Sequence, residues 1–180
     1  MKFDRKLDPN FLWYYLHDMS LYLMLRLIHI FGMGLTFGPF VVNLLILIWA
    51  RRIQESSLRI FALRIFYSAD WIALVGLLMQ PVFGLTLLIY RPAPYTGILK
   101  LGIKIILLLV TFVNLVSILQ PSVQDEIRVI EEIGLENGRE NDRYRRAHRN
   151  LLASFSVSFV LILVIMAISV LLPPPPVTPL

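Results

Sequence analysis

Long uncharged stretches alternate with short polar segments along this chain. The first covers residues 27–49 and lies between Arg26 and the pair Arg51 and Arg52. At 1.5 Å per residue a helix over this stretch spans about 34 Å, whereas the hydrocarbon core of a bilayer is about 30 Å thick. The pattern therefore predicts a transmembrane helix, and similar stretches predict three more at about 71–90, 98–119 and 151–172.

The residues between these spans predict shorter elements. The aromatic-rich segment before the first span is typical of the membrane–water interface, so we expect an interfacial helix there. Residues 51–69 alternate arginines with apolar side chains, which predicts a short helix lying on the membrane surface. Pro121 is expected to end the third span, and the capping-box pattern at 122–125 predicts that a new helix starts there.

The second span contains residues that change helix geometry. Pro81 removes a backbone donor near the middle of the span, which predicts a kink. Gly76 and Gly84 flank Gln80 at spacings of four, so these small residues share one face. We expect that face to allow another helix to approach closely.

The predicted fold class is all-α, a four-helix transmembrane bundle that forms a single integral membrane domain over residues 1–172. Residues 120–150 form a cytoplasmic loop, and the proline-rich tail at 173–180 is expected to be extended. Most of the 17 basic residues lie in the loops that follow the first and third spans. Because basic residues favour the cytoplasmic side, we expect both termini outside.

Composition narrows the function classes. With 57% hydrophobic and 16% charged residues the chain is too apolar for a soluble globular domain. The net charge of +5 is explained by arginines flanking the spans, so we expect no nucleic-acid partner. The absence of cysteine excludes iron–sulfur clusters and covalently attached haem, so any redox cofactor would be held by histidine or methionine.

The first span carries the candidate site. Heptad steps from His29 reach Thr36 and Asn43, which places these polar side chains on one face that should look into the bundle. The predicted orientation sets His29 and Lys104 at a similar depth in the outer leaflet. The other two spans meet this layer at residues 83–87 and 165–169. We expect His148, among the arginines before the fourth span, at the level of the lipid headgroups.

An ionisable residue inside a span suggests a functional site, because it is costly in lipid. A haem or quinone pocket and an ion or proton path are two interpretations. In the third, His29 bonds a neighbouring helix and Lys104 extends to the outer interface. The proton path has the least support, because the pattern shows ionisable groups in one layer only. The chain also lacks the sharp motifs of the common enzyme classes, and whether it is an enzyme stays open.

The stretch LRLIHIFGMGLTFGPFVVNLLILIWARR resembles the first helix of HemJ-type protoporphyrinogen oxidases, of CopD-type small membrane proteins and of allied bacterial four-helix membrane families. The similar features are His29, Gly38 about nine positions later, the basic pair that ends the helix, and Lys104 early in the third span. The resemblance implies that His29 ligates b-type haem and that the protein resides in a bacterial inner membrane.

The HemJ type has a further histidine later in its third helix, where the nearest polar residue here is Asn114. This departure argues against ligation by two histidines and against the oxidase activity. The second axial ligand would have to be Met33, Met79 or Met166, or there is none; of the three, Met166 has the better depth. Haem iron accepts methionine opposite histidine.

Two hypotheses of different classes follow. In the first, the bundle holds haem b through His29, and Lys104 and Arg26 neutralise the haem propionates. Electrons then pass to or from a quinone or a partner protein. In the second, the chain is a cofactor-free accessory subunit of a larger, respiratory-type membrane complex. Its polar face then holds helices together, and its partners are other membrane subunits.

Overall fold

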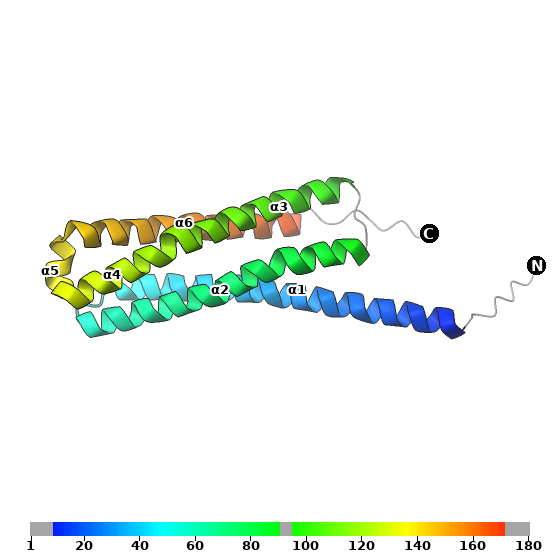
Figure 1. Ribbon diagram of the computed structural model, residues 1–180, viewed down its shortest axis with the longest axis horizontal. Coiled ribbons are helices and arrows are strands. Elements are labelled where there is room, and N and C mark those ends of the chain that lie inside the picture. Colours follow the sequence, from blue (N-terminus) through cyan, green and yellow to red (C-terminus); the bar gives the residue numbers. More distant parts are fainter. Residues whose placement is uncertain (1–8, 91–94, 172–180) are drawn as a thin grey trace, which may run out of the picture.

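The computed structural model describes residues 9–90 and 95–171, and it describes side chains for 19–89, 99–136 and 140–169. The described residues form helices and no strand. In chain order these are α1 (Pro9–Ala50), α2 (Ser56–Tyr90), α3 (Tyr95–Asn114), the π-helix η1 (Leu115–Leu119), α4 (Gln120–Ile133), α5 (Leu135–Glu140) and α6 (Asp142–Leu171). Figure 1 shows the long helices side by side, with α5 at one end.

In the described part of the chain, four helical stretches are long and apolar enough to cross a membrane: Met19–Ala50, Ser56–Ile89, Leu99–Ile133 and Asp142–Ser169. Large apolar side chains such as Leu27, Trp71 and Val110 are exposed on the outside of the bundle. So much exposed apolar surface is typical of a protein surrounded by lipid. The prediction of an all-α, four-helix transmembrane bundle is confirmed, and the side on which the termini lie stays a prediction.

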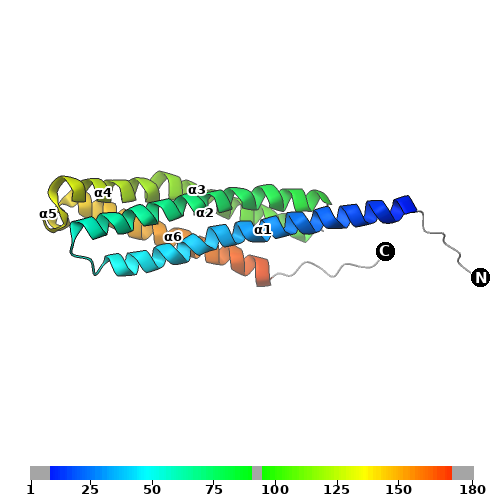
Figure 2. The ribbon, with the colours of Figure 1, turned by 90° about the horizontal axis from the view of Figure 1, so that it is seen from below.

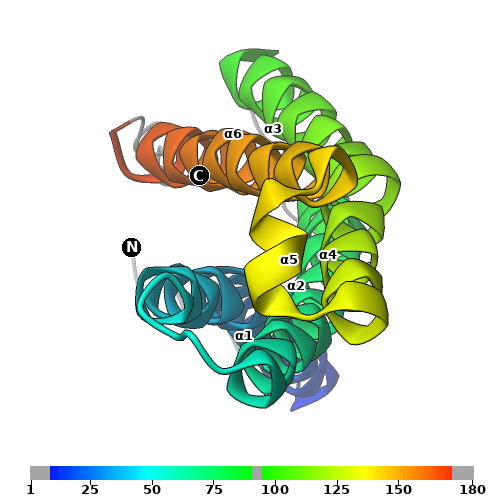
Figure 3. The same cartoon turned by 90° about the vertical axis from the view of Figure 1, so that its left-hand side faces the viewer.

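The bundle consists of two helix pairs. α1 packs along α2, while α3, η1 and α4 pack along α6. The pairs meet mainly near α5, where α2 contacts α4. Figures 2 and 3 show this arrangement from below and from the α5 end. The two pairs are thus held together more firmly at the α5 end than at the other.

α1 and α2 approach each other closely at Gly76. A Cβ atom at this position would lie 2.6 Å from the backbone nitrogen of Thr36 and 2.8 Å from the carbonyl oxygen of Gly32. Only glycine avoids such an overlap, so the predicted close approach is confirmed. α2 continues as a helix through Pro81.

The structure corrects the prediction of a surface-lying helix at 51–69. Residues 56–69 are the first turns of α2 and are continuous with the second span. The reason is the side chain of Arg59, which is only 3% exposed and is paired with Glu126 on α4. The arginines of this segment are therefore not all available to a membrane surface. The helix expected before the first span is continuous with it in α1.

The structure also shows that Pro121 does not end the third span. The preceding turn is the π-helix η1, in which the backbone N–H of Gln120 bonds to the carbonyl of Leu115. This change of hydrogen-bond spacing lets the helix continue past proline, as π-bulges do elsewhere. Ser122 Oγ does not cap a helix but donates to the carbonyl of Ile118 at 2.7 Å. The proline-rich tail at 173–180 lies outside the described residues.

Candidate functional site

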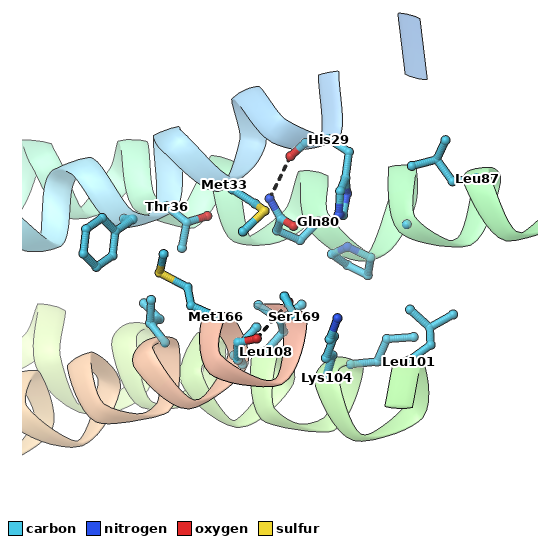
Figure 4. A pocket seen from close by; sticks show the side chains of 16 residues that line it. His29, Met33, Thr36, Gln80, Leu87, Leu101, Lys104, Leu108, Met166 and Ser169 are labelled. Carbon is cyan, nitrogen blue, oxygen red and sulfur yellow. Dashed lines mark hydrogen bonds between the residues drawn. The ribbon is translucent and has the colours of Figure 1, made fainter. Parts of the chain in front are cut away.

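A cavity of about 230 Å³ lies between the two helix pairs, in the half of the bundle away from α5. All four long helices contribute to its wall. The wall is mainly apolar, and the side chains in it that carry nitrogen, oxygen or sulfur are His29, Met33, Thr36, Gln80, Lys104, Met166 and Ser169. Figure 4 shows these residues directed into the space between the pairs. The arrangement is typical of a ligand site, which is mostly apolar with a few converging polar groups.

His29 supplies an imidazole to the wall of this cavity. Its Nδ1 atom is buried and has no hydrogen-bond partner among the described residues. The ring lies against Gly84, because a Cβ atom there would lie 3.5 Å from Cε1 of His29. The backbone carbonyl of His29 accepts a hydrogen bond of 3.1 Å from Nε2 of Gln80, which joins α1 to α2. The helix contact is thus made by the backbone, and the imidazole is not used for it.

Lys104 brings a positive charge to the same cavity from α3. Its side chain points between the helix pairs toward the side on which His29 lies (Figure 4). Among the described residues, no carboxylate lies within ion-pair distance of its Nζ atom. A cation in a largely apolar wall is costly unless an anion or water offsets its charge.

The layer predicted from sequence is present. His29 and Lys104 line one cavity, together with Gly84 and Leu87 from α2 and Ile165, Met166 and Ser169 from α6. Met33 and Met166 both line it, whereas Met79 lies against Gly32. Arg26 is exposed, and it is not among the residues that form the described wall.

The polar face of α1 continues beyond the cavity to a buried pair that the sequence pattern does not predict. Asn43 Nδ2 donates to Oδ1 of Asp70 at 2.8 Å, and both residues are 0% exposed. The inward orientation predicted for Thr36 and Asn43 is confirmed. Asp70 had one signal in the sequence: it is the only acidic residue between Glu55 and Asp125.

A second polar group, the Glu126 cluster, consists of Arg59, Glu126, Tyr144 and His148. Oε1 of Glu126 accepts from Nε of Arg59 at 3.2 Å and from the Tyr144 hydroxyl at 3.3 Å, while Oε2 pairs with Nδ1 of His148 at 3.0 Å. Nη1 of Arg59 also donates to the carbonyl of Ala50 at the end of α1. The cluster therefore joins α1, α2, α4 and α6 near α5. His148, predicted at the headgroup level, pairs with a buried carboxylate.

The Asn43–Asp70 pair and the Glu126 cluster add buried ionisable groups at other depths in the bundle. The sequence pattern indicated ionisable groups in one layer, but the structure buries Asp70 and the Arg59–Glu126 pair at two further levels along α2. Sequence alone does not pair these residues, because Arg59 and Glu126 are 67 positions apart. No group of three or more His, Cys, Asp or Glu side chains within the described residues could hold a bare metal ion.

Fold and cavity together define a class: an integral membrane protein with four spanning helices and an amphipathic cavity between two helix pairs. The chain belongs to the DUF2269 family of predicted integral membrane proteins, whose model matches residues 23–173. This match covers most of each long helix. Comparisons with curated proteins and with solved structures gave no match. The resemblance to HemJ-type and CopD-type proteins stays a prediction.

Proposed function

We propose that the protein binds b-type haem in the cavity between the helix pairs and takes part in electron transfer in a bacterial inner membrane. The observation that carries the proposal is the imidazole of His29, which lines the cavity and has a nitrogen without a hydrogen-bond partner in the described part of the chain. Haem needs only one or two axial ligands from the protein, so a single histidine is enough to begin a site.

The other donors in the wall support the same assignment. Met166 on α6, or Met33 as the alternative, would help His29 to hold the haem iron, since both thioethers line the cavity. Lys104 would offset the charge of a propionate, which needs a cationic partner in this apolar setting. Arg26 is exposed three positions before His29 and would act only at the outer edge of the site. When bound, haem supplies one-electron chemistry, and a quinone or a partner protein would exchange the electron.

The volume of the cavity sets a condition on this proposal. At about 230 Å³ the cavity is smaller than the pockets of roughly 300–1,000 Å³ that usually hold drug-sized ligands. A porphyrin is larger than a typical drug-sized ligand. Binding therefore requires the two pairs to separate in this half. Their contacts are concentrated at the α5 end, so this half can widen at the lower cost.

The absorption spectrum of the purified protein tests the proposal. We expect a Soret band in stoichiometric amount, which His29→Ala abolishes because the axial ligand is lost. Lys104→Ala should keep the band but release haem more readily, because it removes a counter-ion and not a ligand. His148→Ala is the matched control, since it removes an imidazole outside the cavity and should keep the band. Colourless wild-type protein, or an unchanged spectrum in His29→Ala, would reject haem binding through His29.

The second candidate function is a cofactor-free accessory subunit of a larger membrane complex. It is favoured by the small cavity volume, because a bundle that only supports neighbours needs no room for a porphyrin. Purification from native membranes in mild detergent distinguishes the two. A larger complex that contains this chain, with no haem assigned to it, supports the accessory role and contradicts the first proposal.

A further inference from the structure

The Asn43–Asp70 pair is a fully buried polar pair outside the cavity and the Glu126 cluster. One hydrogen bond joins the two side chains, from Nδ2 of Asn43 to Oδ1 of Asp70. The remaining oxygen of each group, Oδ1 of Asn43 and Oδ2 of Asp70, is buried and has no partner among the described residues. Two buried acceptors without donors are costly, and native structures rarely keep them.

No described cation offsets a negative charge on Asp70. The ion pairs of the described residues do not include it, and the arginines that precede it on α2, Arg59 and Arg64, are paired with Glu126 and Glu131. The facing helices are without charged or histidine residues over 30–50 on α1, 105–124 on α3 to α4, and 150–171 on α6. An ionised Asp70 would therefore be a buried charge with one amide donor only, a state that proteins avoid.

The level of the pair places it within the membrane. Asn43 belongs to the uncharged stretch 27–49 and lies about 10 Å along the helix from Ala50. Asp70, which is bonded to it, lies at the same level on α2. Water is scarce at such a level, so a missing donor is not readily replaced by solvent.

We propose that Asn43 and Asp70 form an intramembrane proton-binding site, in which Asp70 carries a proton on Oδ2. The proton comes from solvent and adds to the carboxylate, with no other bond made or broken. A protonated carboxyl is a donor as well as an acceptor, so Oδ2–H of Asp70 can bond to Oδ1 of Asn43. The acid and the amide are then joined by two hydrogen bonds. Both orphaned oxygens gain a partner, and the buried charge is removed.

A metal cation is the competing ligand, since carboxylate and amide oxygens also bind hard cations. Calcium and magnesium, for example, take six or more oxygen ligands. The pair offers two free oxygens, and no group of three or more His, Cys, Asp or Glu lies around it in the described chain. The geometry thus favours a proton, and it does so whether or not the cavity binds haem.

Infrared spectroscopy of the wild-type protein in detergent tests this site directly. We expect the carbonyl stretch of a protonated carboxyl at neutral pH, which shifts when the exchangeable hydrogen is replaced by deuterium. Asp70→Asn should remove that band and still fold, because a second amide can make both hydrogen bonds with Asn43. Asp125→Asn is the control, since Asp125 is half exposed and paired with Arg143. Its loss should leave the protonated band and remove a carboxylate band.

Two results would overturn the proposal. If Asp70→Asn removes a carboxylate band and not a protonated one, Asp70 is ionised. If sodium or calcium raises the melting temperature of the wild type but not of Asp70→Asn, the ligand is a metal cation. The haem spectrum is a separate measurement, and its outcome does not change either result.

Discussion

The two ends of the bundle differ in how they treat polar groups, with the Asn43–Asp70 pair between them. Near α5, both carboxylate oxygens of Glu126 have partners, and the donors come from α2 and α6. At the cavity end, among the described residues, the imidazole of His29 has a buried nitrogen without a hydrogen-bond partner, and Lys104 has no carboxylate beside it. The satisfied end holds the helix pairs together. The unsatisfied end leaves the imidazole of His29 and the ammonium of Lys104 available to a ligand.

The largest expected effect breaks the satisfied end. Glu126→Ala leaves Arg59 buried and uncompensated, and breaking a buried pair in this way costs about 3–5 kcal/mol. The free energy of unfolding in detergent micelles would measure the loss. Glu131→Ala is the matched control, because its pair with Arg64 is exposed and such pairs contribute about 0–1 kcal/mol. Equal losses in the two variants would show that the Glu126 cluster does not hold the bundle.

An intermediate effect is expected within the α1–α2 pair. Gly76→Ala forces a methyl group against the backbone of α1 and should cost about 1–3 kcal/mol, as overpacking of a close contact does. Gly34→Ala and Gly102→Ala are the controls, since a Cβ atom at either position meets nothing within 4 Å. Unfolding of the three variants would be compared by circular dichroism. A Gly76→Ala protein as stable as its controls would contradict the close approach.

The smallest effect sharpens the comparison at the cavity end. Gln80→Leu removes the hydrogen bond to the His29 carbonyl, and bonds of this kind between membrane helices contribute about 0.6 kcal/mol. Unfolding in detergent should therefore change little. A loss as large as that of Glu126→Ala would mean that the cavity end is structural and would remove the contrast between the two ends.

Much of the fold could be predicted from apolar run length and the spacing of polar residues. The heptad spacing of His29, Thr36 and Asn43 predicted the inward face of α1, and helix direction predicted that His29 and Lys104 share a layer. The Glu126 cluster could not be predicted, because its members lie on α2, α4 and α6 and meet only after packing. The sequence pattern predicts Arg59 at the membrane surface, because an arginine beside apolar residues usually stays there and nothing near it in the sequence indicates its distant carboxylate.

The π-helix η1 acts as a phase shift between α3 and α4. Each residue of an α-helix turns the chain by about 100°, so the one extra residue in a π-turn rotates everything after it by that amount relative to everything before it. On the α3 side Asn114 faces Ser158 of α6, and on the α4 side Glu126 faces both Arg59 of α2 and His148 of α6. One continuous helix can therefore present one face to its neighbours before the π-turn and a different face after it. Removing a single residue from 115–119 would keep both helices but rotate α4 by about 100° relative to α3. Asn114 and Glu126 could then not both keep their partners.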